Sequence, residues 1–224
     1  MVRLATLICA FQLGLTQSAS ADGVAAAGRI DFLHTGGSCS GVLVAPHVVA
    51  TAAHCTPEAS QAELNVAFQP AAPVDARKVV KGIRHPLYDP DSPREDWKLR
   101  FDIGVVTLAE GITGEQIETF PIGDDAMPGE TLFIVSWRKP DGPRPRQRAC
   151  PVLSVGVRGL VTLGCAVVGG ESGAPVLRKT PTGLELVAIL SSRSRLLEQP
   201  IAQATNVRLR LPPLLDLVKA ETGS

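Results

Sequence analysis

Short apolar runs follow one another along the chain from residue 28 onward, separated by turn residues such as Gly, Pro and Asp. The runs are rich in Val, Ile and Leu, which favour half-buried strands. We expect strands at residues 41–45, 48–52, 64–68, 78–83, 103–108, 131–136, 152–157, 161–165, 175–177 and 184–190. Because evenly spaced strands without intervening helices are typical of all-β proteins, the sequence predicts a barrel or a sandwich.

One segment near the C-terminus has helical spacing instead. Its apolar positions fall on one helical face: Leu214, Leu215, Leu217 and Val218. Pro212 and Pro213 precede them, and proline suits the first position of a helix. The sequence therefore predicts a helix over residues 212–220.

The N-terminal 21 residues have the pattern of a secretory signal. Arg3 gives the positive start, residues 4–15 the apolar run, and residues 19–21 a small-x-small cleavage site. A transmembrane anchor is the alternative, but the run falls short of the ~20 residues that a span needs. We expect a secreted or periplasmic protein whose mature form starts at Asp22.

Charge and cysteine content narrow the possible partners. Lys+Arg and Asp+Glu both number 22, so neither a nucleic acid nor a membrane surface is expected as a partner. Five cysteines are present, and Cys9 leaves with the signal. The even number that remains predicts two disulfides, in one of three pairings. No Cys-x-x-Cys or paired-His spacing occurs, so we expect no metal and no cofactor.

Three stretches carry candidate chemistry. Residues 169–175 place Ser172 between glycines, and such a turn can present a hydroxyl beside backbone N–H groups. A serine hydroxyl needs a base, which His54 offers upstream in residues 51–55. Asp102 lies between the two and opens an apolar run. A nucleophile, a base and an acid are the parts of a triad for attack on a carbonyl.

In this order, His then Asp then Ser, the motifs resemble those of the trypsin/chymotrypsin-like serine peptidases, of the kind secreted by bacteria. Residues 51–55 match the family's histidine motif, and residues 170–175 resemble its Gly-Asp-Ser-Gly-Gly-Pro, with Glu171 and Ala174 as departures. Unrelated folds that carry the same triad use other orders. The resemblance covers residues 28–219.

The resemblance implies two packed antiparallel six-stranded β-barrels and a short C-terminal helix. With residues 1–21 as signal, residues 22–118 would form the first barrel and residues 119–224 the second barrel with the helix. A monomer that cleaves proteins or peptides is expected.

The resemblance also implies roles for single residues. His54, Asp102 and Ser172 would be catalytic, and the N–H groups of Gly170 and Ser172 would form the oxyanion hole. Ser191 would lie beside Asp102 and the substrate backbone. Cys39–Cys55 resembles the family's bridge at the histidine loop, which leaves Cys150–Cys165 to join neighbouring strands before the serine loop.

Two departures bear on mechanism. In many family members a freed N-terminus pairs with the acid before the serine, here Glu171. Arg29 and Ile30 keep only part of that activation site, and they lie too close to Cys39 to reach the serine loop. Our hypothesis is that signal removal alone gives an active enzyme.

The second departure concerns specificity. The family's pocket floor corresponds to Ala166, followed by Val167 and Val168, so no carboxylate is available for a Lys or Arg substrate. A small or apolar P1 residue is favoured. Arg193 and Arg195 could instead recruit an acidic P1 residue or partly fill the pocket.

The rival functions are a catalytically silent protease-like binding protein and an esterase with the same triad.

Residues 138–148 carry four arginines and three prolines. We interpret them as a solvated loop, because long polar connections usually lie at the surface; a rim that attracts acidic substrates is the alternative.

Overall fold

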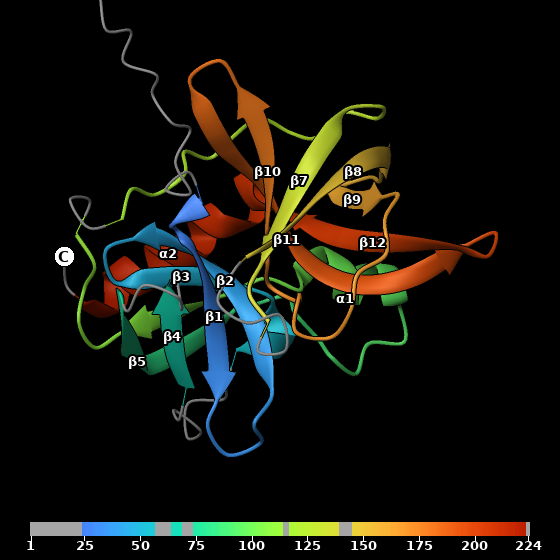
Figure 1. Cartoon of the computed structure of the whole chain (residues 1–224). Coiled ribbons are helices and arrows are strands. Elements are labelled where there is room, and N and C mark those ends of the chain that lie inside the picture. The colour runs from blue at the N-terminus through green and yellow to red at the C-terminus, as the bar shows by residue number, and fades with distance from the viewer. Residues whose placement is uncertain (1–23, 57–63, 69–73, 114–116, 139–144, 223–224) are drawn as a thin grey trace, which may run out of the picture.

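The computed structural model describes residues 24–56, 64–68, 74–113, 117–138 and 145–222. Within these residues the strands form two closed antiparallel barrels of six strands each, packed side by side (Figure 1). The proposed signal, its cleavage site and Cys9 lie outside the described residues. The predicted two-barrel fold is confirmed.

The first barrel has the strand order β1-β2-β3-β6-β5-β4 and closes where β4 pairs with β1. Its strands are β1 (Ala27–Phe32), β2 (Ser38–Ala45), β3 (Val48–Thr51), β4 (Leu64–Phe68), β5 (Val74–Arg84) and β6 (Gly104–Leu108). Two short helices accompany them, the 3-10 helix η2 (Ala53–Cys55) after β3 and α1 (Glu95–Phe101) before β6. Both helices end close to candidate catalytic residues.

The second barrel has the order β10-β11-β12-β9-β8-β7 and closes where β7 pairs with β10. Its strands are β7 (Thr131–Ser136), β8 (Arg146–Val155), β9 (Leu160–Leu163), β10 (Pro175–Thr180), β11 (Gly183–Leu196) and β12 (Gln199–Asn206). The serine loop connects β9 to β10. It lies against the first barrel, because Ser40 of β2 hydrogen-bonds to Ser172 and Gly173 approaches Thr51 of β3.

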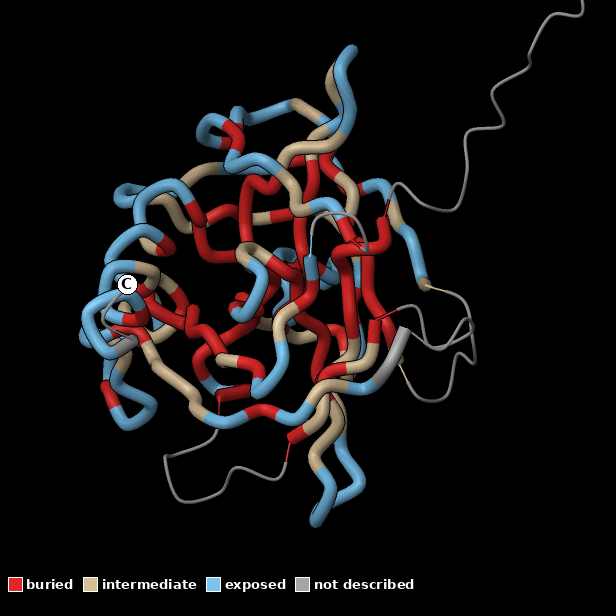
Figure 2. The backbone as a smooth tube through the Cα atoms, turned by 90° about the vertical axis from the view of Figure 1, so that its left-hand side faces the viewer, coloured by how far each residue is buried: buried red, intermediate tan, exposed pale blue. Residues whose placement is uncertain are grey.

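Apolar side chains fill both barrels and the contact between them. Figure 2 shows that the buried residues lie in the interior of the molecule and the exposed ones at its periphery. Ile30, Leu43 and Phe68 are fully buried in the first barrel, and Leu163 in the second. Ile189 of β11 belongs to the same buried cluster as the first barrel. Since this packing is shared, the barrels are fixed against each other and so are the side chains at their junction.

The C-terminal helix α2 (Val207–Thr222) begins earlier than the predicted residue 212. Asn206 accounts for the difference, because its Oδ1 accepts a 3.0 Å hydrogen bond from the Leu209 N–H and thereby caps the helix. Pro212 and Pro213 lie inside the helix and deprive two exposed carbonyls of their donors. The buried face of α2 packs with the core cluster of the first barrel, so the helix crosses back from the second.

Among the described residues, no helix has the length and apolar character needed to cross a membrane.

Candidate active site

His54 lies in η2, directly after β3. A disulfide joins the next residue, Cys55, to Cys39 on β2, as the resemblance implied. The short helix is therefore covalently held to the barrel wall. Both cysteines are buried, whereas His54 keeps 40% of its side chain exposed. This arrangement presents the imidazole to solvent from a rigid base.

Asp102 follows the last residue of α1 and is only 5% exposed. Its Oδ2 lies 2.8 Å from His54 Nδ1, and its Oδ1 accepts a 2.9 Å hydrogen bond from the His54 backbone N–H. An ionised carboxylate can only accept, so Nδ1 carries the proton and Nε2 is left as the basic nitrogen. The Ser191 hydroxyl also donates to Oδ2, as expected for its place beside Asp102.

Burial and the carboxylate act in opposite directions on the imidazole. Partial burial lowers the pKa of His54, whereas the hydrogen bond to Asp102 and the Asp102 charge raise it. The carboxylate prevails, although the Arg84 charge opposes it, and the His54 pKa lies above its ordinary value. The imidazolium form is therefore stabilised, which is what a base needs when it takes a proton.

Ser172 lies in a loop that is fastened to the first barrel. Its carbonyl oxygen accepts a 2.7 Å hydrogen bond from the Ser40 N–H on β2. The next residue, Gly173, has φ +81°, and a Cβ there would collide with Ser40 and Thr51. Only glycine allows the loop to approach β2 and β3 this closely.

One cavity of about 370 Å³ brings the three predicted residues together: His54, Asp102 and Ser172 all line it. Ser191 and Arg193 line the same cavity, together with Tyr88 and Lys98. His54 and Asp102 come from the first barrel and Ser172 from the second. Tyr88 was not expected here, and burial raises its pKa to about 12, so it stays a neutral hydroxyl at physiological pH.

Two backbone N–H groups near Ser172 have no acceptor among the described residues. Within the described part of the chain, neither the Gly170 N–H nor the Ser172 N–H donates a hydrogen bond to another residue. The carbonyl of Glu171 accepts from the Ala174 N–H at 3.0 Å, which directs the Ser172 N–H the opposite way. These are the two donors predicted for the oxyanion hole.

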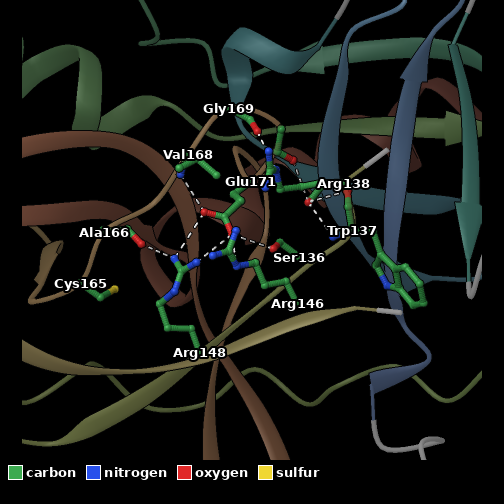
Figure 3. Close-up of polar contacts among 12 residues, drawn as sticks. Ser136, Trp137, Arg138, Arg146, Arg148, Cys165, Ala166, Val168, Gly169 and Glu171 are labelled. Atoms are coloured by element: carbon green, nitrogen blue, oxygen red, sulfur yellow. Dashed lines mark hydrogen bonds and ion pairs between the residues drawn. The ribbon is translucent and has the colours of Figure 1, made fainter. Parts of the chain in front are cut away.

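Glu171 is 1% exposed and meets several donors (Figure 3). Arg148 Nη2 lies 3.2 Å from its Oε1, the Ser136 hydroxyl donates to Oε1 at 3.1 Å, and the Val168 N–H donates to Oε2 at 2.8 Å. Arg148 also donates to the carbonyl of Ala166. A cation from β8 therefore occupies the place beside this acid.

This contact corrects our interpretation of residues 138–148 as a solvated loop. Its last residues, Arg146 to Arg148, begin β8, and Arg148 points inward to Glu171. Residues 139–144 lie outside the described residues. Ile30, at the partial activation site, is fully buried in β1 and pairs with Cys39 and Val66, so it does not approach Glu171.

Ala166 lies beside a second cavity, of about 320 Å³. Arg193 and Val167 line both cavities, which places this space next to Ser172. Its described lining holds no carboxylate: Ala166, Val167, Arg193, Ser194, Arg195, Pro200 and Ile201. The disulfide Cys150–Cys165 fastens the wall just before Ala166 to β8, and this second pairing is also as expected.

A metal reading of the histidine region does not fit its chemistry. Cys39, His54 and Cys55 offer ligand atoms within 4.8 Å of one another. Both sulfurs are joined in a disulfide, however, and a metal binds thiolates.

A family model described as Trypsin matches residues 25–208. The chain belongs to the trypsin family. The match covers both barrels, from before β1 to the start of α2, and it includes every residue that lines the cavity around Ser172. As a trypsin-family chain it is of the serine-protease type, a class of hydrolases. A search of curated proteins found no match.

Proposed function

We propose that this chain is a secreted serine endopeptidase that hydrolyses peptide bonds through an acyl-enzyme. One observation carries the proposal: the imidazole of His54, tied at 2.8 Å to a buried carboxylate, lines the same cavity as Ser172. Membership of the trypsin family supports it. Residues 22–118 and 119–224 would be the two barrel domains of a monomer that follows the signal at residues 1–21.

In the proposed reaction, Ser172 Oγ attacks the scissile carbonyl while His54 Nε2 takes the hydroxyl proton. Asp102 keeps the imidazole in the tautomer that leaves Nε2 free and stabilises its charged form. His54 then passes the proton to the leaving amine. Water, deprotonated by the same nitrogen, releases the acid product from Ser172.

The developing oxyanion is stabilised by the N–H groups of Gly170 and Ser172, neither of which has an acceptor among the described residues. Donors of this kind act without reorganisation at the moment of reaction. Loss of one typically costs ~2.7–4 kcal/mol of transition-state stabilisation.

Signal removal alone gives the active enzyme in this proposal. Glu171 has its cation in Arg148, so no freed N-terminus is needed to hold the serine loop. N-terminal sequencing of active protein tests this point. A start near Asp22 is expected, and a start at Ile30 would contradict the proposal.

Export to the periplasm or the medium is proposed from the signal-like N-terminus and the two disulfides. Disulfides persist in oxidising compartments. Expression with and without residues 1–21, followed by fractionation, tests export. Retention of the full-length chain in the cytoplasm would contradict it.

The decisive experiment is labelling by a fluorophosphonate, which reacts only with an activated serine. The purified protein should be labelled, and Ser172→Ala should not. A properly folded wild type without labelling would favour the silent binding protein. That alternative is motivated by Arg193, which lines both cavities beside the site. Matched peptide and ester substrates then separate a peptidase from an esterase.

A further inference from the structure

The peptide between Gly169 and Gly170 carries the Gly170 N–H, one of the two proposed oxyanion donors. It is the central peptide of a turn closed by a 3.2 Å hydrogen bond from the Glu171 N–H to the Val168 carbonyl. Gly170 has φ +90°, whereas Gly169 does not take a positive φ. These values define a type II turn.

Type I and type II turns differ mainly in the direction of this central peptide. The C=O and N–H of a trans peptide point in opposite directions. Rotation to the type I form would therefore put the Gly169 carbonyl where the Gly170 N–H now points. Both flanking residues are glycines, so no Cβ hinders that rotation. The direction of this donor must be fixed by a contact from elsewhere.

Arg138 makes that contact, from the segment that follows β7. Its Nε donates a 2.9 Å hydrogen bond to the Gly169 carbonyl (Figure 3). The stem of the side chain lies over the turn, because its Cγ is 3.4 Å from the point that a Cβ on Gly170 would occupy. The bond is charge-assisted, which makes it stronger than one between neutral groups.

Neighbouring contacts hold other parts of the loop but not this peptide. The Ser40 hydroxyl donates to the Gly170 carbonyl at 3.1 Å, and the Ser40 N–H donates to the Ser172 carbonyl. Within the described part of the chain, the Gly169 carbonyl accepts no hydrogen bond other than the one from Arg138.

We propose that Arg138 is a positioning residue that holds the Gly169–Gly170 peptide with its N–H directed to the oxyanion. The inference rests on the proposed endopeptidase function, and it adds a residue that acts through the backbone and not on the substrate. Without the guanidinium, the peptide populates the rotated form and the hole loses one donor, while the fold and the triad stay in place.

The test compares Arg138→Met, which keeps the stem and removes the guanidinium, with Arg138→Lys, which keeps a donor. Arg208→Met is the matched control, because Arg208 is exposed on α2 and pairs with Asp124. We measure kcat and KM on a peptide substrate and the inhibition constant of a peptide boronic acid. That compound forms a tetrahedral adduct with an activated serine, so its affinity reports on the oxyanion hole.

Arg138→Met should lower kcat roughly 10- to 100-fold with little change in KM, which is less than the ~100- to 1,000-fold that loss of a whole donor causes. The affinity of the boronic acid should fall in parallel with kcat/KM. Arg138→Lys should recover part of both losses, and Arg208→Met should match the wild type. Unchanged boronic acid affinity in Arg138→Met would overturn the proposal.

A structural measurement separates this inference from the proposed function. A crystal structure of Arg138→Met should show the Gly169 carbonyl turned to the cleft and a negative φ at Gly170. An unrotated peptide would overturn the positioning role, whatever the activity. Wild type that fails to react with a fluorophosphonate would instead overturn the endopeptidase proposal, and the crystal structure would still decide the role of Arg138.

Discussion

Ser191 on the second barrel donates a 2.5 Å hydrogen bond to Oδ2 of Asp102 on the first barrel. The same oxygen faces His54 Nδ1, so one carboxylate atom is shared between the imidazole and the opposite barrel. This bond links the two halves of the molecule at the proposed triad. Its removal should therefore affect the imidazole without opening the core.

Ser191→Ala should raise the pKa of His54, because the Asp102 charge loses a donor and attracts the imidazolium more strongly. The acid limb of the kcat/KM profile should then move to higher pH, and kcat/KM at neutral pH should fall roughly tenfold. Ser154→Ala, at an exposed position near the end of β8, is the control. A limb that stays in place or moves to lower pH would contradict the shared-carboxylate argument.

Asp102→Asn should lower the pKa of His54, opposite to the effect expected of Ser191→Ala. The His54 pKa lies above its ordinary value in the wild type, where the Asp102 bond and charge outweigh burial. Activity requires the neutral imidazole, so it rises as pH passes upward through that pKa. The variant should lose about 10⁴-fold in kcat, and its residual acid limb should lie at lower pH. Proton NMR titration of His54 measures the shift directly.

Arg148→Met should destabilise the protein, because it leaves the buried Glu171 carboxylate without its main cation. We expect a loss of about 2–3 kcal/mol, below the ~3–5 kcal/mol of a fully buried pair, since 20% of the Arg148 side chain is exposed. Urea unfolding measures the free energy. Arg146→Met, whose side chain is 44% exposed at 3.9 Å from Glu171, should cost less than about 1 kcal/mol.

The double variant Arg148→Met with Glu171→Gln tests the origin of that loss. If the cost comes from an unpaired buried charge, the double variant should be more stable than Arg148→Met alone. Equal or lower stability would show that Arg148 acts by packing and not as a partner for the charge.

Substrate preference should exclude cationic P1 residues. The cavity beside Ala166 has no carboxylate in its described lining, and Arg193 would repel Lys or Arg. Peptides with Ala, Val or Leu at P1 should be cleaved at least about 100-fold better than the Lys peptide, a difference of ~2.7 kcal/mol. Efficient cleavage after Lys would show that the pocket is wrongly located. A Glu peptide distinguishes the two roles left open for Arg193, recruitment of an acid or filling of the pocket.

Much of the site could be predicted because its residues stand in local motifs. His54 and Ser172 each sit in a run of small residues and glycines that is needed for close approach, such as Gly173 against Ser40. The disulfide pairings followed from the same resemblance. The predicted strands were found because their apolar runs match the inner faces of the barrels.

What was missed depends on contacts between distant segments. β1 was not predicted because its outward face carries Arg29 and Asp31, which pair with each other at 2.8 Å and interrupt the apolar pattern. β12 was missed because its inward residues are small, such as Ala202 and Ala204. Helix α1 was not predicted either, because four of its seven residues are charged.

Arg148 was the most consequential omission. Nothing in a run of arginines and prolines tells which cation will meet Glu171, because that depends on the pairing of β8 with β7. The alternation of β8 was a usable signal, since it turns Arg148 and Cys150 to the same side.

The cation beside Glu171 belongs to the sheet of the second barrel, so in the proposed enzyme its arrival would be timed by folding and not by a cut in the chain. The proposed enzyme would then be competent as soon as its second half has assembled. A producing cell could not store it as an uncleaved precursor. The producing cell would have to limit its activity by rapid export or by an inhibitor that fills the cleft.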